Sequence, residues 1–214
     1  MTITVAIDGP AASGKGTLAR QLAASLGVPH LDTGLLYRAV GRRVLDRGEN
    51  PADGVAATAS ARALVREDLA RDDLRGPVAD AAAAAVASEP GVRAALLDFQ
   101  RGFAAQAGGA VLDGRDIGTV VCPDADIKLY VTASAEVRAK RRLAEIESIG
   151  GTASYSEILA DIARRDERDM GRVDSPLKPA PDAHLLDTSE MAIEAAFLAA
   201  MAIVDDVLAR RNKA

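Results

Sequence analysis

Hydrophobic and polar positions follow one another in a pattern that predicts alternating strands and helices along most of the chain. Short β-branched or aliphatic runs predict five strands, at residues 3–7, 28–31, 111–112, 127–131 and 185–186, of which the first is expected to be buried. Apolar residues with helical spacing predict a first helix over Lys15–Leu26, and further helices from Ser134, over 155–169 and over 190–211. This alternation indicates an α/β fold, a parallel sheet with helices on both faces.

The second quarter of the chain has a different pattern. Asp32 or Thr33 is expected to cap a helix that runs to about Arg47, and the stretch from 51 to 106 is helical and rich in alanine. Breaks at Gly76-Pro77 and Pro90-Gly91 divide it. Alanine favours helices but fills little core volume, so we expect a small, mobile lobe rather than a heavily packed one.

Charged residues come directly after several predicted strands. They are Asp8, Asp32, Asp113, Arg115, Asp116 and Asp187. The carboxyl ends of parallel strands meet at one edge of a sheet, and ligands of such sheets bind there. We therefore expect these side chains to gather on one rim.

The composition narrows the choice of ligand. Aromatic residues make up 3% of the chain, which disfavours a protein that stacks exposed bases on aromatic side chains. The net charge of -5 argues against a general nucleic-acid binder. The arginines nevertheless cluster in 138–142 and 164–172, and this favours a small anionic substrate.

The cysteine content and the hydropathy of the chain bear on its cellular location. The single cysteine, Cys122, cannot form an intramolecular disulfide, and we interpret it as an apolar filler at a turn. The N-terminus lacks the features of a signal peptide, and no run approaches 18 uninterrupted apolar residues. We expect a soluble, cytoplasmic monomer with no nucleic-acid or membrane partner.

One motif between the first predicted strand and helix has a specific chemical meaning. It fits the pattern G-x-x-x-x-G-K and consists of Gly9, Pro10, Ala11, Ala12, Ser13, Gly14, Lys15, Gly16 and Thr17. Backbone N–H groups of such a loop point at phosphate oxygens, and the following helix adds the partial positive charge of its N-terminus. The lysine supplies a charge for the β- and γ-phosphates. We therefore predict a nucleoside triphosphate site; the motif alone leaves the acceptor open.

The loop departs from the usual pattern at Gly16. A metal-binding hydroxyl commonly follows the lysine, whereas here the hydroxyl comes one place later, at Thr17. We therefore expect Mg²⁺ to be held mostly by phosphates and water, with Asp113 in the outer coordination shell. The alternative, a glycine-rich turn without a ligand, would require the glycines, the lysine and the correct flanking elements to coincide.

Three further motifs follow the phosphate loop along the chain. They are HLDTGLLYR (30–38), DGRDIGTVV (113–121) and RRDERD (164–169). Together with GKGT in the phosphate loop, they make the chain resemble the bacterial cytidylate kinases, which are nucleoside monophosphate kinases. The resemblance covers nearly the whole chain, and four motifs in sequence make it highly specific.

This resemblance implies an ATP-dependent (d)CMP kinase of pyrimidine metabolism, which converts ATP and CMP or dCMP into ADP and CDP or dCDP with Mg²⁺. It also implies the P-loop kinase fold, a five-stranded parallel sheet with a helical monophosphate-binding lobe and a short lid. Residues 1–214 would form a single kinase domain. Its core would span about 1–36, 108–140 and 173–214, its monophosphate-binding lobe about 37–107, and its lid about 141–172.

The resemblance implies a role for each matching site residue. Those that would read the cytosine are Thr33 and Asp116. Those that would hold the CMP phosphate or its surroundings are Arg38, Arg93 and Arg115. Those that would contact the sugar and phosphate are Arg165, Asp169 and Arg172. The catalytic set would be Lys15, Arg115, Arg141 and Arg165, with Arg141 on the ATP phosphates.

These residue types suit the implied roles. Phosphoryl transfer needs mainly alignment and charge neutralisation, and forked guanidinium groups grip phosphate in a bidentate manner. A carboxylate that accepts from the exocyclic amine can select cytosine over uracil, which suits Asp116. Arg165, Asp169 and Arg172 are spaced i, i+4, i+7, so we expect all three to project from one helix face.

Structural explanations stay open for some of these charges. The charged side chains of 164–172 would also suit a solvated helix, and so would Arg138, Arg141 and Arg142. Arg38 could be an ordinary surface residue of its helix. His30 is interpreted as a residue that packs at a strand end.

The chain departs from bacterial cytidylate kinases in the monophosphate-binding lobe. The stretch 62–77 is too short and too charged for their small antiparallel insert, and 81–85 is all alanine where a serine is expected. Asp80, Thr58, Ser60 or a water molecule would replace that serine contact.

Two other functions remain open. The chain could phosphorylate another acceptor, such as UMP, AMP or a small sugar acid. It could also be a regulator that closes on ATP without transferring phosphate, although the density of arginines around a second anion site argues against this.

Overall fold

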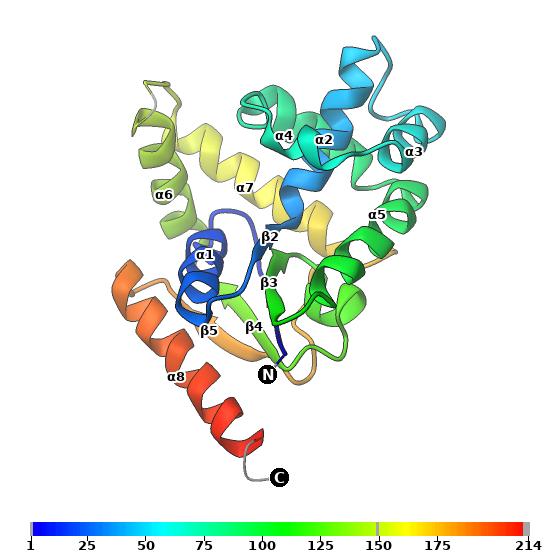
Figure 1. Ribbon diagram of the computed structural model, residues 1–214. Helices are drawn as coiled ribbons and strands as arrows, with labels where there is room; N and C mark the ends of the chain where they lie inside the picture. Colours follow the sequence, from blue (N-terminus) through cyan, green and yellow to red (C-terminus); the bar gives the residue numbers. More distant parts are fainter. Residues whose placement is uncertain (1, 149, 212–214) are drawn as a thin grey trace. The chain divides into compact units, whose positions relative to one another are not determined.

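The computed structural model describes residues 2–148 and 150–211, which form two compact units (Figure 1). Unit 1 is built from residues 1–31 and 107–214, and unit 2 from residues 32–106. The finer division into core, lobe and lid within a single kinase domain stays a prediction.

A five-stranded sheet organises unit 1. Its strands lie in the order β2-β3-β1-β4-β5. Their bounds are β1 (Ile3–Asp8), β2 (His30–Asp32), β3 (Gly109–Gly114), β4 (Ile127–Thr132) and β5 (His184–Asp187). The last residue of β2 is counted with unit 2. The pairs β1–β3, β1–β4 and β4–β5 are parallel. The predicted α/β fold with a five-stranded parallel sheet is confirmed.

One face of this sheet carries a large apolar cluster. Alternate side chains of β1 and β4, such as Val5 and Leu129, pack against α1 (Lys15–Leu26) and α8 (Ile193–Arg211). The predicted spacing of α1 is confirmed, because Leu18 and Leu22 are both buried in this cluster. Figure 1 shows α1 and α8 on the same side of the strands.

The opposite face of β4 holds a buried lysine. Lys128 points away from the α1–α8 side, because strand side chains alternate and its neighbours Ile127 and Leu129 belong to the apolar core. Its Nζ donates to both carboxylate oxygens of Asp182, at 2.9 and 2.7 Å. A Cβ placed on Gly118, in the π-helical turn η2 (Ile117–Val121), would lie 3.2 Å from Lys128 Cδ. Turn η2 and the segment that precedes β5 therefore cover this face.

Two helices, α6 (Ala135–Ser148) and α7 (Tyr155–Met170), pack on each other through a small apolar cluster. The Ser134 hydroxyl accepts from the Val137 N–H at 3.3 Å, which confirms its expected role as the cap of α6. The expectation that Arg172 shares a face of α7 with Arg165 and Asp169 is wrong. The helix ends at Met170, and the chain then turns back so that the Leu177 N–H donates to the Asp169 carbonyl at 2.8 Å.

Unit 2 is helical. It consists of α2 (Thr33–Asp46), α3 (Gly54–Arg62), the 3₁₀ turn η1 (Arg66–Ala70), α4 (Pro77–Val86) and α5 (Pro90–Ala104). Pro77 and Pro90 are the first residues of their helices, where a missing N–H costs nothing, so the predicted breaks are confirmed. The stretch 62–77, all of which the structure describes, contains η1 and no strand.

The alanines of unit 2 allow close packing between helices. A Cβ added to Gly41 of α2 would lie 2.8 Å from the backbone carbon and the Cβ of Ala82 in α4. The side chains of Leu36, Val40 and Val86 are fully buried. Packing in unit 2 is therefore closer than the alanine content suggested, because small side chains let the helix backbones approach.

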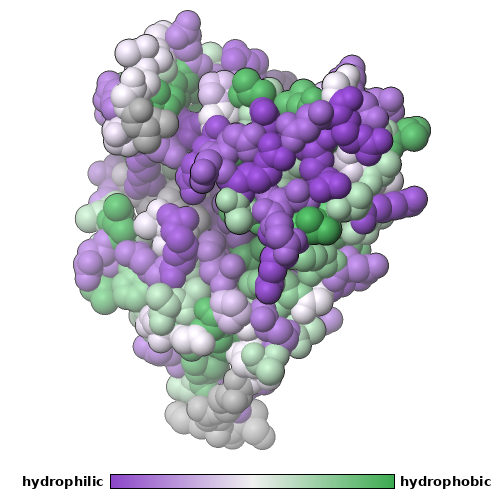
Figure 2. All heavy atoms as spheres, turned by 45° about the horizontal axis from the view of Figure 1, so that its top comes forward, coloured by the Kyte–Doolittle hydropathy of each residue, from purple (hydrophilic) through white to green (hydrophobic). Residues whose placement is uncertain are grey.

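Hydrophilic side chains cover most of the face that Figure 2 shows, with hydrophobic residues in smaller patches. Large exposed apolar side chains are scattered among several elements; examples are Val55, Val78, Val173, Leu185 and Ile193. No helix among the described residues is long and apolar enough to cross a membrane.

The α2–α4 contact predicts the effect of one added methyl group. Gly41→Ala should lower the free energy of unfolding by about 1–3 kcal/mol, because the new methyl overlaps Ala82. Gly102→Ala is the matched control: Gly102 lies inside α5 with no atom within 4 Å of an added Cβ, so this change should be neutral or slightly stabilising. Urea unfolding of both variants tests this, and equal stability of the two would contradict it.

Candidate active site

The parallel register brings the charged residues of unit 1 to one edge of the sheet. Asp8, the last residue of β1, lies opposite Gly114 of β3 on one side and Tyr130 of β4 on the other. Thr132 of β4 lies opposite Asp187 of β5. The predicted rim is therefore confirmed for the residues of this unit.

The phosphate loop leaves β1 at this rim under a tight steric constraint. Gly9 has φ of 155°, and a Cβ at this position would overlap the carbonyl oxygen of Val131. Only glycine avoids this overlap, so the chain can turn out of β1 at Gly9 and into the loop. Ala12 adopts a positive φ of 59°, which is uncommon for a residue with a side chain.

The loop has several features of an anion site. Helix α1 begins at Lys15 without a side-chain cap, and a helix leaves the amides of its first turn without partners inside the helix. The Ser13 hydroxyl is buried and has no hydrogen-bond partner among the described residues. Lys15 is buried, and its ammonium donates to the Pro10 carbonyl at 3.2 Å, across the loop. These groups suit the phosphates of a nucleotide.

Arg141 of α6 lies against the loop. Its Nη1 donates to the Ser13 carbonyl at 3.3 Å and to the Thr188 hydroxyl at 3.0 Å, and its Nη2 donates to the Thr188 carbonyl at 2.7 Å. Nη1 is also 3.7 Å from the position of a Cβ on Gly14. The predicted neighbourhood of Arg141 and the phosphate loop is therefore present, whereas its action on ATP stays a prediction.

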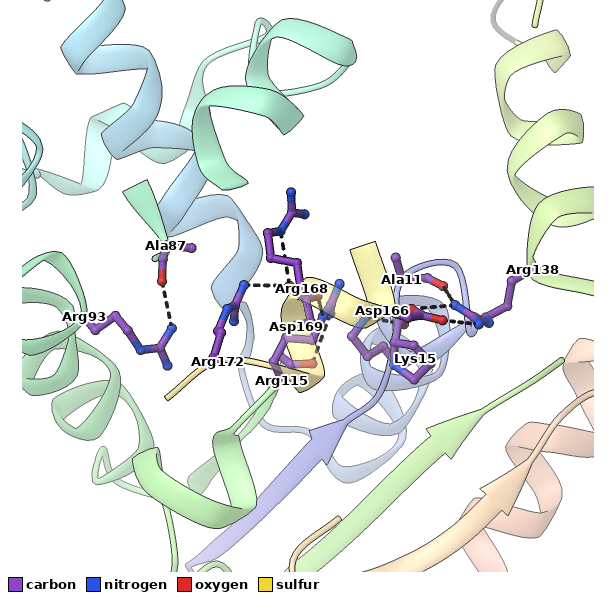
Figure 3. Close-up of polar contacts among 12 residues, drawn as sticks. Ala11, Lys15, Ala87, Arg93, Arg115, Arg138, Asp166, Arg168, Asp169 and Arg172 are labelled. Atoms are coloured by element: carbon purple, nitrogen blue, oxygen red, sulfur yellow. Dashed lines mark hydrogen bonds and ion pairs between the residues drawn. The ribbon is translucent and has the colours of Figure 1, made fainter. Parts of the chain in front are cut away.

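The other two arginines of α6 have partners different from those of Arg141. Arg138 is buried and donates to both oxygens of Asp166 in α7, at 3.0 and 2.5 Å, and to the Ala11 carbonyl at 3.3 Å (Figure 3). It therefore ties α7 to the phosphate loop. Arg142 pairs with Glu145 at 2.8 Å on the helix surface, as the solvated-face alternative predicts.

Asp113 occupies a position that suits a metal ligand. It is buried at the end of β3, and its Oδ1 lies 2.6 Å from His30 Nε2. Its Oδ2 is 3.7 Å from the position of a Cβ on Gly16, beside the first turn of α1. Carboxylate oxygen is a ligand that Mg²⁺ prefers, so Asp113 fits the expected outer-shell role. Within residues 2–148 and 150–211, no group of three or more His, Cys, Asp or Glu could hold a metal ion.

Asp169 is the centre of a buried charge cluster. Its Oδ2 accepts from Arg115 Nε at 2.9 Å, and its Oδ1 accepts from Arg172 Nη2 at 2.7 Å (Figure 3). Burial acts to raise the pKa of Asp169, but Arg115, Arg172 and Arg165 together hold it below its usual value. Arg172 therefore reaches the cluster although it lies beyond the helix.

Asp116 lies next to a second buried carboxylate. Both Asp116 and Asp8 are buried, and Asp8 accepts from the backbone N–H groups that directly follow Asp116. Burial raises the pKa of Asp8 from 3.8 to about 6; the backbone hydrogen bonds and Lys15 oppose this, and the charge of Asp116 adds to it.

The remaining predicted acceptor residues belong to unit 2. Thr33 is buried as the first residue of α2. Arg38 Nε donates to Asp80 at 3.1 Å, and the Arg93 guanidinium lies 5.8 Å from the centre of the Tyr37 ring. Arg93 also donates to the Ala87 carbonyl at 3.4 Å.

This geometry distinguishes the side chains that could replace the missing serine. Ser60 is fully buried in α3, and Thr58 lies so close to Gly91 in α5 that an added Cβ there would overlap its hydroxyl. Asp80, by contrast, contacts the proposed phosphate ligand Arg38 directly. Asp80 is therefore the best placed of the three.

Two partner residues were missed or misread from the sequence. His30 was interpreted as a packing residue, but it pairs with Asp113. Asp166 was given no role, although it pairs with Arg138. His30 and Asp113 are 83 positions apart. No local pattern shows such a pair; only the adjacency of β2 and β3 in the sheet does.

Comparison with known proteins places the chain among nucleotide kinases. The family model described as cytidylate kinase matches residues 5–206. The chain belongs to the cytidylate kinase family. Among its relatives in this family, one from Mesorhizobium japonicum is 68% identical over 99% of this chain and 98% of its own. Cytidylate kinases from Acidiphilium cryptum and Brucella suis are 62% and 59% identical, each over 97% of this chain and over 98% and 95% of their own.

Two solved structures resemble the chain in fold at low sequence identity. An uncharacterized protein from Eubacterium ventriosum has a TM-score of 0.58 at 14% identity, over 95% of this chain and 99% of its own. An unliganded sugar kinase from Janibacter has a TM-score of 0.50 at 16% identity, over 96% of this chain and 95% of its own. At such identities the likeness concerns the fold alone.

The raised pKa of Asp8 predicts a dependence of stability on pH in this family member. The unfolded chain releases the Asp8 proton near pH 3.8 and the folded chain near pH 6, so ionisation between these values favours unfolding. The contribution of Asp8 to the free energy of unfolding should therefore fall by up to about 3 kcal/mol as the pH rises from 3.8 to about 6. In Asp8→Asn the side chain cannot titrate, so this variant lacks the change of stability with pH that Asp8 causes.

The measurement is urea unfolding of the wild type and Asp8→Asn between pH 4 and 8, in the presence of a chelator. The free energy of unfolding of the wild type, relative to that of Asp8→Asn, should decrease as the pH rises to about 6 and then stay constant. A difference that does not vary with pH would contradict the raised pKa.

Proposed function

We propose that this chain transfers the γ-phosphoryl group of ATP to CMP or dCMP, giving ADP and CDP or dCDP. The supporting observation is that the phosphate loop and the Arg115–Asp116 segment leave neighbouring parallel strands at the same edge. Asp8, directly before the loop, lies opposite Gly114, directly before Arg115. This adjacency supports a triphosphate site at the loop and, beside it in unit 1, an acceptor site at Arg115 and Asp116.

The chemistry is an in-line displacement at phosphorus. A phosphate oxygen of CMP forms a bond to the γ-phosphorus, and the bond between that phosphorus and the β,γ-bridging oxygen breaks, leaving ADP. A phosphate monoester loses its second proton near pH 6, so the attacking oxygen is already ionised at neutral pH. The protein therefore needs to align two nucleotides and neutralise charge rather than remove a proton.

The donor side is assigned to the loop and α6. Backbone amides of 9–17 and the N-terminus of α1 would surround the β- and γ-phosphates, with the ammonium of Lys15 beside them. Arg141, already held by Thr188 and Ser13, would add a guanidinium without having to be ordered first. Asp113 would hold Mg²⁺ through water, and Mg²⁺ when bound supplies charge neutralisation on the ATP phosphates.

Acceptor roles are assigned in each unit separately. In unit 1, Asp116 would accept from the cytosine amino group, and Arg115, Arg165, Asp169 and Arg172 would contact the phosphate and sugar. In unit 2, the corresponding residues would be Thr33, Arg38 and Arg93. Asp169 supports this, because it holds the guanidinium groups of Arg115 and Arg172 in fixed positions before a ligand arrives.

The monomeric state, the cytoplasmic location and the absence of nucleic-acid or membrane partners stay predictions from the sequence. The same holds for the identity of the metal as Mg²⁺.

Lys15→Ala should lower kcat/KM for phosphoryl transfer by at least about 100-fold, because the transferred group loses a positioned positive charge. The measurement is formation of ADP and CDP from ATP, Mg²⁺ and CMP. Lys178→Ala removes an exposed lysine and should leave the rate unchanged. Equal rates for both variants would refute the role of the loop, and binding of ATP by the wild type without product would favour a regulator.

Asp116→Ala should reduce the preference for CMP over UMP by about 10- to 100-fold, since one base-selective hydrogen bond is lost. The measurement is kcat/KM for each monophosphate, with Asp124→Ala as the control for an exposed aspartate in the turn that follows η2. An unchanged ratio would show that Asp116 does not read the base. A wild-type preference for AMP or a non-nucleotide acceptor would overturn the proposed acceptor itself.

A further inference from the structure

Asp8 connects two segments that are far apart in the sequence. Its Oδ1 accepts from the Ile117 N–H at 2.8 Å, and its Oδ2 accepts from the Gly118 N–H at 2.8 Å. Ile117 and Gly118 are the first two residues of turn η2, whose first amides have no partner within the turn. One carboxylate at the end of β1 therefore fixes the start of η2.

The contact is closely fitted. A Cβ on Gly118 would lie 3.4 Å from Asp8 Oδ2 and 3.2 Å from Lys128 Cδ, so a glycine allows the amide to reach the carboxylate without displacing either neighbour. Hydrogen bonds that a carboxylate accepts from backbone amides are stronger than those between neutral groups. The two bonds therefore define the backbone position of η2 more firmly than a neutral side chain could.

This arrangement has an electrostatic cost. Asp8 is buried and lies close enough to Asp116 for the two negative charges to repel, and Lys15 offsets only part of this. An apolar residue at the end of β1 would avoid both the burial and the repulsion. A charge retained under these conditions points to a function for the contact.

The fixed backbone adjoins the residues that are assigned to the acceptor. Asp116 directly precedes Ile117, and Arg115 precedes Asp116 and donates to Asp169 at 2.9 Å. A displacement of η2 would therefore move the carboxylate of Asp116 and change the support that Arg115 and Asp169 give each other.

We propose that Asp8 is a positioning residue for acceptor selection, which holds the backbone at Ile117 and Gly118 and thereby sets the places of Arg115 and Asp116. It does not touch either nucleotide itself. This inference rests on the proposed role of Asp116 in reading cytosine.

The decisive variant is Asp8→Asn, assayed above pH 7. The amide oxygen can accept one N–H, but the amide nitrogen is a donor and faces the second N–H, so one of the two bonds is lost. We expect the ratio of kcat/KM for CMP over UMP to fall about tenfold, through a raised KM for CMP, while KM for ATP changes little. Gly118→Ala keeps every charge and crowds the same contact, and should change the ratio in the same direction.

Val5→Ala is the matched control. Val5 is a fully buried residue of the same strand, and its side chain belongs to the apolar cluster on the α1–α8 face, whereas η2 covers the opposite face. Val5→Ala should leave the CMP-over-UMP ratio unchanged. Hydrogen exchange adds a second measurement: the amides of Ile117 and Gly118 should exchange faster in Asp8→Asn than in the wild type and Val5→Ala.

The outcomes separate a positioning role from a merely structural one. A lower ratio together with faster exchange at Ile117 and Gly118 supports the proposal. If Asp8→Asn slows CMP and UMP equally, as a general loss of stability would, the proposal is wrong; if that variant does not fold, Gly118→Ala is judged by the same criterion.

The Asp116→Ala result distinguishes this inference from the proposed function. If Asp116→Ala loses selectivity and Asp8→Asn keeps it, the positioning role alone fails. If Asp116→Ala keeps selectivity, the assignment of Asp116 fails and takes the positioning role with it.

Discussion

The parallel pairing of β1 with β3 is the constraint on which the site of unit 1 depends. Because these strands run side by side in register, the chain leaves both at the same edge, with Asp8 opposite Gly114. One exit becomes the phosphate loop and the other becomes the Arg115–Asp116 segment. The exit into the phosphate loop is narrow, since Gly9 packs against the carbonyl of Val131 in β4 with no space for a side chain. The sheet thus makes neighbours of the two segments that are proposed to bind the donor and the acceptor.

Buried charges then fix the side chains at this edge. Arg138 is held by Asp166, and Arg115 and Arg172 are held by Asp169. A buried guanidinium without a partner would be costly, and each pair removes that cost while ordering the arginine. Because phosphoryl transfer depends on charges that are already in position, such ordering serves the proposed reaction as well as the fold. Bound phosphates would share these arginines with the aspartates rather than order them anew.

The helices of unit 2 pack closely although they are rich in alanine. Its many alanines suggested a loosely packed lobe, but Gly41 and Ala82 bring two helix backbones together so closely that an extra methyl does not fit. Shape at the contact, not the volume of each side chain, decides how well such helices pack. The same unit places Asp80 in an ion pair with Arg38, one position before the run of alanines in which a serine was expected, and this contact makes Asp80 a candidate to replace that serine.

Local sequence patterns were sufficient to predict the helices, the strands and the phosphate loop. Helix α1 begins at Lys15 as the apolar spacing predicted, α4 and α5 begin at their prolines, and the motif from Gly9 to Thr17 lies between a strand and a helix. Local pattern was insufficient where a helix ends: the spacing of Arg172 suggested a shared face of α7, but the chain turns back after Met170. Which charged side chains pair with each other depends on the three-dimensional arrangement of the strands. The bonds from Asp8 to Ile117 and from His30 to Asp113 join residues 109 and 83 positions apart, and strand order, which no local spacing encodes, brings them within hydrogen-bond distance.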